Sequence, residues 1–175
     1  MITECFPMTI SSDDVQCERE LHSSVEDGSM MHSKESVRYI VIHCTGTRSN
    51  VDYGVLQLLR DHKARKFRTI GYHFFIRRNG EVTQHRKLLE VGAHCRPFNR
   101  CSIGVCYEGG LDEQGHYADT RTREQKDQMV LLLMRLMKLF PQAHIVGHRD
   151  LPGTTPKACP CFDASEYGYI ERFYR

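Results

Sequence analysis

The stretch VRYIVIHCT, residues 37–45, decides the fold, because it is a nearly continuous apolar run in which β-branched side chains predominate. Runs of this kind are typical of an interior strand that is covered on both faces. The run leads into His43, so the predicted strand carries an imidazole at its end. A rigid strand end can hold such a side chain in place for a binding or catalytic site.

Two later segments show the periodicity of helices. Residues 51–65 are expected to form one helix, and residues 122–140 form the second. The second begins with a capping-box pattern, Thr122 and Gln125, and stops before Pro141. Apolar side chains spaced to line one side of each helix predict its packed face. These are Val55, Leu56, Leu59 and Ala64 in the first helix, and Met129, Leu132, Leu133, Leu136 and Phe140 in the second.

The remaining strands are marked by turn residues and by a second histidine. Asn79-Gly80 predicts a hairpin within residues 70–85. Residues 102–110 form a further strand closed by glycines, and residues 143–148 form a short strand that ends at His148. Strands and helices intermix without a strict βαβ repeat. The fold class is therefore predicted to be mixed α/β, a single domain with a central mixed β-sheet flanked by helices.

Charge separates the first residues from the rest of the 175-residue chain. Residues 1–36 carry eight acids and two bases, a net charge of −6, and the remaining residues carry +8. The head shows no sustained apolar period, so we expect a poorly ordered or loosely docked arm, with a separate folded unit as the alternative. Residues 37–175 are expected to form the folded domain.

Targeting signals are not visible in the sequence. The head lacks the basic start and the apolar run of a Sec signal. No stretch approaches the roughly 20 apolar residues of a membrane span. We expect synthesis in the cytoplasm, with release by lysis or by a route other than Sec, and no membrane span.

Most of the eight cysteines are expected to be free thiols or ligands, since no signal for export is visible. Cys44 and Cys106 lie in apolar runs, so we place both in the core. Cys95 and Cys101 could form a bridge in an oxidising compartment.

Histidines and cysteines together indicate a metal site. His43 and His148 each close a β-rich run, and a thiolate at Cys159 or Cys161 would supply a third ligand. Imidazole and thiolate are both good zinc ligands, and a catalytic zinc uses three protein ligands with the fourth position open. The spacing alone does not distinguish such ligands from structural or surface histidines.

The segment RDHKARKFR, residues 60–68, holds five bases in nine residues. A solvated basic face is one interpretation, and attraction to an anionic polymer or to nucleic acid is another. No aromatic-interleaved or helix-turn-helix pattern supports nucleic acid, so no nucleic-acid partner is expected.

Five blocks in order resemble a known family: VIHCTGT, IGYHFFIRRNGEV, GAHCRPFNRCSIGVCYEGG, GHRDL and KACPCFD. Together they are similar to the zinc-dependent N-acetylmuramoyl-L-alanine amidases of the phage-lysozyme and peptidoglycan-recognition-protein type, over roughly residues 37–165. The resemblance implies one Zn²⁺ ion and hydrolysis of the amide between N-acetylmuramic acid and L-alanine, in peptidoglycan or a muropeptide. We expect a monomer. The alternative is a non-catalytic peptidoglycan-recognition module, against which the retained Cys159 argues.

The resemblance also implies roles for individual residues. His43, His148 and Cys159 match the three zinc ligands, which leaves Cys161 as a packed thiol or a spare ligand. Tyr72 matches the tyrosine that faces the zinc-bound water of the phage enzymes, and Lys157 matches their catalytic lysine. With a reference pKa near ~10, Tyr72 is either a reluctant base or a hydrogen-bond donor.

Three further residues are candidates for substrate binding: His94, Thr45 and Asn99. His94 could equally be a structural histidine. His73, next to Tyr72 in the sequence, is expected to point to the opposite face and to be structural.

Overall fold

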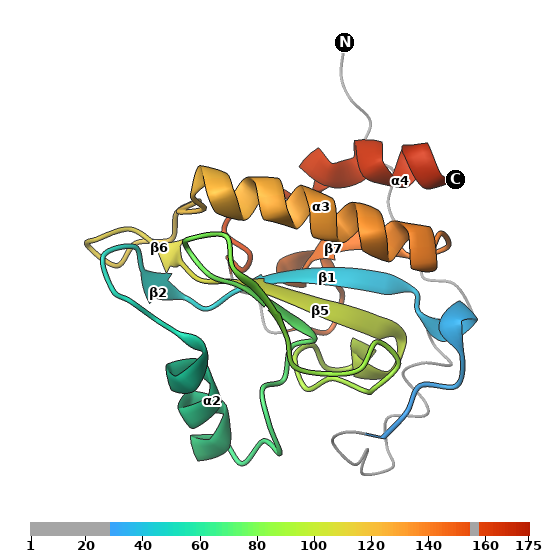
Figure 1. Ribbon diagram of the computed structural model, residues 1–175, viewed down its shortest axis with the longest axis horizontal. Helices are drawn as coiled ribbons and strands as arrows, with labels where there is room; N and C mark the ends of the chain where they lie inside the picture. The colour runs from blue at the N-terminus through green and yellow to red at the C-terminus, as the bar shows by residue number, and fades with distance from the viewer. Residues whose placement is uncertain (1–28, 155–157) are drawn as a thin grey trace.

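The computed structural model describes residues 29–154 and 158–175 (Figure 1). Short 3-10 helices lie at Lys34–Ser36, Phe98–Cys101, His148–Asp150 and Ala164–Tyr167. The strands and helices, in chain order, are β1 (Tyr39–Cys44), β2 (Thr47–Arg48), α2 (Val55–Ala64), β3 (Phe74–Ile76), β4 (Val82–Gln84), β5 (Ser102–Tyr107), β6 (Gly110–Leu111), α3 (Arg123–Leu139), β7 (His144–Gly147) and α4 (Gly168–Tyr174).

The central sheet has five strands in the order β4-β3-β5-β1-β7. Strand β1 pairs in parallel with both β5 and β7, and all six of its residues are buried. The predicted interior strand is therefore confirmed. Only the β3–β4 hairpin is antiparallel among the pairs of this sheet, and its turn contains Gly80 at a φ of 84°. The sheet is mixed, as predicted, and the short strands β2 and β6 form a separate pair.

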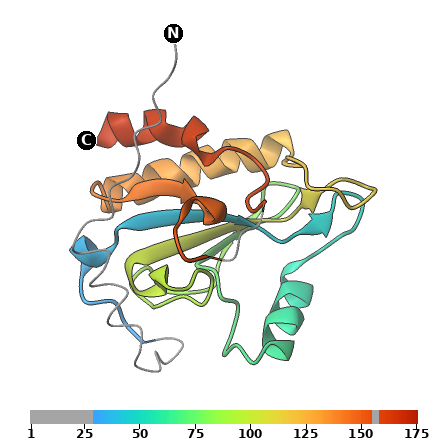
Figure 2. The same ribbon diagram turned by 180° about the vertical axis from the view of Figure 1, so that it is seen from behind.

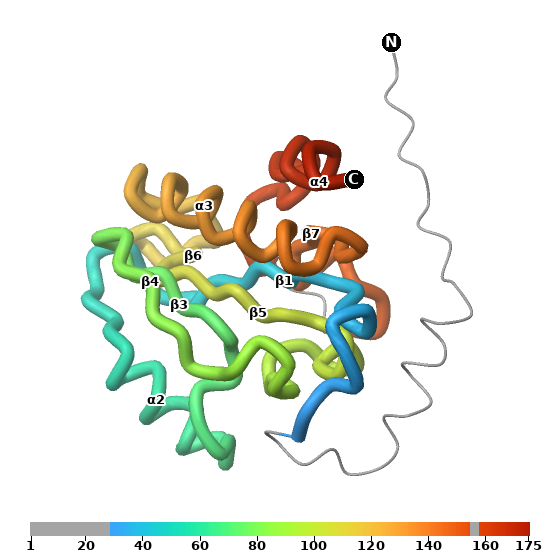
Figure 3. Tube along the Cα trace, turned by 45° about the vertical axis from the view of Figure 1, so that its right-hand side comes forward, coloured from blue at the N-terminus to red at the C-terminus, as the bar shows by residue number. Residues whose placement is uncertain are grey.

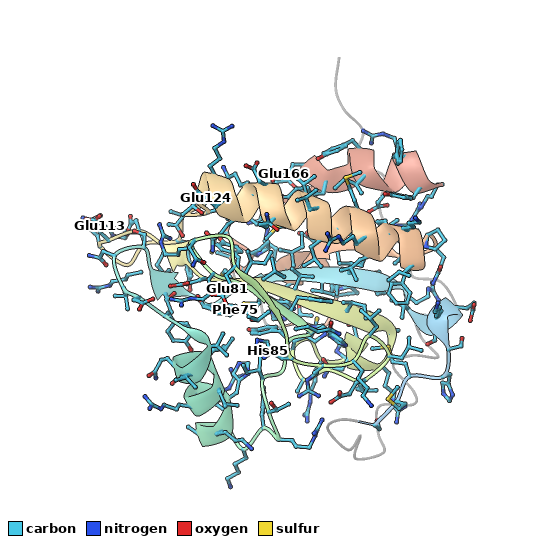
Figure 4. All side chains as sticks on the ribbon, viewed as in Figure 1. Phe75, Glu81, His85, Glu113, Glu124 and Glu166 are labelled. Atoms are coloured by element: carbon cyan, nitrogen blue, oxygen red, sulfur yellow. The ribbon has the colours of Figure 1, made fainter. Side chains whose placement is uncertain are left out.

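Helices cover the sheet on both faces. Figures 1 and 3 show α3 and α4 on one side and α2 on the other. Because side chains alternate along a strand, Ile40 and Ile42 of β1 join the core under α3, whereas Val41 belongs to a cluster on the opposite face. His43 has the parity of Val41, so it lies on the face away from α3. Phe75, labelled in Figure 4, packs with Leu58 of α2.

Helix α3 forms as its sequence predicts. Thr122 Oγ1 accepts a hydrogen bond from the Gln125 backbone N–H at 3.1 Å, and Gln125 Oε1 accepts one from the Thr122 N–H at 3.0 Å. All five predicted core positions of the helix are buried. The buried Gln125 amide also donates to the carbonyls of Ile76 and Glu108, which fastens the first turn of the helix to the sheet.

The packed face of α2 differs from the prediction. Leu56 is 70% exposed and Ala64 is also exposed, whereas Leu58 and His62 are the buried positions. Val55 and Leu59 are partly buried against the same cluster, as expected. The helix packs against the rest of the protein along a narrow stripe only. The packed face predicted from periodicity was wider than this stripe, so it included Leu56 and Ala64, which face solvent.

The cysteines and the start of the chain can be placed in part. Cys44 and Cys106 are buried in the core, and Cys95 and Cys101 are buried and are not bridged to each other. Residues 29–36 contact the rest of the domain, since Met31 is buried and its N–H donates to Leu89 O. Residues 1–28 lie outside the described residues, and the predicted boundary at residue 36 stays a prediction.

None of the helices in residues 29–154 and 158–175 combines the length and the apolar composition needed to cross a bilayer.

His73 is a structural histidine. Its Nδ1 accepts a hydrogen bond from the Gly104 N–H at 3.0 Å, so its Nε2–H donates to Glu90 O at 2.8 Å. The ring thereby joins β5 to the loop that follows β4, and burial lowers its pKa to about 4. It precedes β3 rather than lying within it.

Replacing the N-cap should destabilise the domain. Thr122→Ala removes the hydroxyl that caps α3 and that donates to Arg78 O, and caps of this type contribute about 0.5–2 kcal/mol. We expect a decrease of that size in the free energy of unfolding measured by urea denaturation. Thr122→Ser keeps the hydroxyl and should stay close to the wild type; an equal loss in both variants would contradict the capping role.

Stability should depend on pH through His73. Its folded-state pKa of about 4 lies below the ordinary value of 6.5, so the unfolded chain binds the proton more readily. The contribution of neutral His73 to the free energy of unfolding is complete above pH 6.5. It is lost as the pH falls from about 6.5 to 4, by roughly 3 kcal/mol at most. Denaturation at several pH values should show a shallower decline in His73→Gln. The exposed His116→Gln is the control and should keep the wild-type decline.

Candidate active site and metal centre

The two strand-end histidines meet because of the parallel register of β1 and β7. The last pair of this ladder is Ile42 with Gly147. The next residue along each strand is His43 or His148, and their ring centroids are 4.6 Å apart. Figure 2 shows the segment after β7, in orange and red, lying against β1. This segment continues to Cys159, and one donor atom from each of His43, His148 and Cys159 lies within 4.8 Å of the other two.

Three hydrogen bonds fix Cys159 beside the histidines. The backbone N–H of Cys44, next to His43, donates to the Cys159 sulfur at 3.3 Å. The N–H of Arg149, next to His148, donates to Cys159 O at 3.0 Å. The Tyr107 hydroxyl then donates to Pro160 O at 2.7 Å. The loop that carries the thiol is thus bonded to strand β1, which carries His43, and to the 3-10 helix after β7, which carries His148.

This donor set fits a zinc ion. Two imidazoles and one thiolate are ligands that zinc prefers, and three protein ligands leave a fourth position open. At Zn–S and Zn–N bonds of about 2.3 and 2.1 Å, a tetrahedral sulfur–nitrogen pair stands about 3.6 Å apart. The Cys159 Sγ to His43 Nδ1 distance is 3.9 Å. Burial, with His148 close by, lowers the pKa of His43 well below its ordinary value, which leaves a neutral imidazole with a free lone pair.

Tyr72 stands beside His43, one of the three candidate ligands. Its ring centroid is 5.1 Å from that of His43 and 5.3 Å from that of His62. Burial raises the pKa of its phenol well above the ordinary value, and the nearby Cys106 thiol acts in the same direction. The phenol is therefore a hydrogen-bond donor at neutral pH. Tyr72 lies just before β3, whereas the sequence predicts that it lies within the strand.

The predicted substrate residues have partners within the protein. Thr45 Oγ1 accepts a hydrogen bond from the Gly109 N–H at 2.9 Å and contacts Thr47 Oγ1 at 2.7 Å. Asn99 Oδ1 accepts hydrogen bonds from two backbone N–H groups, and His94 lies against His43. Their binding of substrate stays a prediction. Lys157 lies outside the described residues.

Cys161 lies beside the site but outside the three-donor cluster. Its Sγ is 3.7 Å from that of Cys44, and its φ is 70°. The Cys44 contact and burial both raise its pKa, with that contact the larger cause. The thiol is thus held in its protonated form, which favours the packed thiol over the spare ligand.

Sequence comparison then decides the family. Residues 33–162 match the family described as N-acetylmuramoyl-L-alanine amidase. The endolysin of Enterobacteria phage K11 is 35% identical over 134 residues, which cover 77% of this chain and 87% of that endolysin. The chain belongs to the N-acetylmuramoyl-L-alanine amidase family. The predictions of this family and of an amidase enzyme are confirmed.

Solved structures show that the amidase shares its fold with endolysins and peptidoglycan-recognition proteins. The N-acetylmuramoyl-L-alanine amidase LysCS of Clostridium intestinale has a TM-score of 0.64 at 24% identity, over 84% of this chain and 88% of that chain. The complex of tracheal cytotoxin with peptidoglycan recognition proteins LCa and LCx has a TM-score of 0.60 at 21% identity, over 76% and 80%. The predicted single-domain, mixed α/β fold is confirmed.

Sequence reasoning missed the residue that anchors the far side of the Cys159 loop. The buried guanidinium of Arg121 lies 3.2 Å from the ring centroid of Phe162 and donates to Glu166 Oε1 at 2.8 Å. Glu166 is labelled in Figure 4. A single arginine in a polar stretch gives no sequence signal of burial. Gly104 was missed too, although a glycine inside a strand indicates that another group approaches closely.

Proposed function

We propose that the amidase uses zinc to hydrolyse the amide bond between N-acetylmuramic acid and L-alanine in peptidoglycan or its muropeptides. The observation that carries the proposal is the cluster of His43, His148 and Cys159, whose donor atoms lie within 4.8 Å of one another. The family match and the similarity to phage endolysins support the same reaction. The likeness to proteins that hold tracheal cytotoxin supports a muropeptide as ligand.

The three residues would hold one ion. Zinc in such a site lowers the pKa of a bound water to about 7, which supplies a nucleophile for an amide carbonyl at neutral pH. The protein keeps the ligands in the required form: His43 is neutral because it is buried. The Cys44 N–H donates to the Cys159 sulfur, which fixes the sulfur beside His43.

Tyr72 is the proposed hydrogen-bond donor beside the ligands. Its raised pKa keeps the phenol protonated, so it can donate a hydrogen bond that orients a water or the substrate oxygen. Lys157 is proposed, from the resemblance, to stabilise the negative charge that develops on the carbonyl oxygen.

A non-catalytic recognition module is the second candidate. The similarity to a peptidoglycan-recognition protein of Drosophila melanogaster, 29% identical over 71% of this chain, motivates it. A binding module has no need of three converging zinc donors, and the chain has all three. We therefore favour the enzyme. The proposed enzyme acts as a monomer, its catalytic domain comprises residues 37–175, and it reaches the wall when the cell lyses.

Zinc content and activity should be lost together when a ligand is removed. Cys159→Ala should purify with little zinc and release no peptide from sacculi or from muropeptides, whereas Cys161→Ala, the matched control, should keep both. Metal analysis and a digestion assay with and without chelator provide the measurement. A wild-type protein that binds wall yet releases no peptide after zinc is restored would favour the recognition module. Zinc loss in Cys161→Ala would instead reject the ligand assignment.

Removing the Tyr72 hydroxyl should separate metal binding from catalysis. Tyr72→Phe keeps the buried ring and should retain zinc, while loss of one positioned donor lowers kcat by about 10²–10³-fold. The measurement is kcat on a soluble muropeptide alongside zinc content. Unchanged kcat would remove Tyr72 from the site.

A further inference from the structure

His43 lies between two partners, one at each ring nitrogen. Its Nδ1 is 3.9 Å from the Cys159 sulfur, on the side of the proposed metal. Its Nε2 is 3.0 Å from Nδ1 of His94, and the two rings meet edge to face at 87°. A neutral imidazole carries one proton, so a ring that binds a metal through Nδ1 must carry that proton on Nε2. His94 is the group that faces it.

The His94 ring occupies a slot that exists because two residues lack a side chain. A Cβ atom on Gly104 would come within 2.7 Å of His94 Cγ, and one on Gly92 within 2.5 Å of its Cδ2. Gly104 lies inside β5 and pairs with Val41 of β1. Glycine weakens a strand interior, and its presence there marks close approach by another group. The strand lacks a side chain at the place where this ring packs.

The backbone that carries His94 is also fixed. Asn99 Oδ1 accepts hydrogen bonds from the N–H groups of His94 and Cys95, at 2.9 and 2.8 Å. The Ala93 N–H donates to Gly71 O at 3.0 Å, which joins this loop to the residue before Tyr72. These bonds locate the imidazole without any substrate.

We propose that His94 is a positioning residue for the metal site: its Nδ1 accepts the Nε2–H of His43 and so holds the His43 Nδ1 toward the metal. This inference rests on the proposed zinc site and adds a group that does not touch the ion. Partners on the second nitrogen of a ligand histidine fix its tautomer and its orientation, and their loss weakens metal binding or activity by about 10- to 100-fold. Within the described residues the other His94 nitrogen, Nε2, is buried without a hydrogen-bond partner.

The first test measures zinc affinity by competition with a chromophoric chelator, independently of activity. His94→Leu removes the acceptor, whereas His94→Asn places an amide oxygen near the position of Nδ1. His116→Leu makes the first change at an exposed site, where the side chain is 79% exposed. We expect zinc binding to weaken about 10- to 100-fold in His94→Leu and to stay near wild type in the other two variants.

The second test needs no variant. In the zinc-loaded wild type, long-range proton–nitrogen NMR correlations should place the proton on Nε2 of both His43 and His94. A proton on His94 Nδ1 overturns the inference, as does wild-type zinc affinity in His94→Leu or an equal loss in His94→Asn. Each of these results leaves the zinc site itself standing. A wild-type protein that binds no zinc overturns both.

Discussion

The parallel pairing of β1 with β7 is the constraint on which the site depends. Because the two strands run in the same direction and their last pair is Ile42 with Gly147, the next residues, His43 and His148, emerge together at one edge of the sheet. The loop after β7 then returns to the same edge, where the N–H groups beside the two histidines bond to Cys159. The fold brings together residues more than a hundred positions apart through ordinary backbone hydrogen bonds.

Burial keeps the imidazoles around this edge in the neutral form. It lowers the pKa of His43, His73 and His94, and for each of them burial is the largest cause. A neutral imidazole has one donor and one acceptor, so each ring can donate a hydrogen bond from one nitrogen and offer a lone pair from the other. Charged rings would repel one another and a metal cation. The apolar sheet face therefore contributes to the chemistry by excluding water.

Much of this arrangement could be predicted from the sequence. The apolar run before His43 and the short strand before His148 mark strand ends directly, and the capping box of α3 marks its start. The exposed Leu56 was predicted wrongly, because periodicity shows which residues share a side but not how wide the contact is. The environment of His94 could not be predicted. Its ring packs against Gly104, and this contact exists only once β5 has joined the sheet.

The Cys159 loop belongs to both layers of the domain. Its thiol lies beside His43, whose side chain is on the face away from α3, while Cys159 itself packs against the core beneath α3, together with Phe162 under the Arg121 guanidinium. An ion bound to both Cys159 and His43 would link the core beneath α3 to the opposite face of the sheet. Opening either layer would then require release of the ion, so resistance to unfolding would increase with the concentration of free metal.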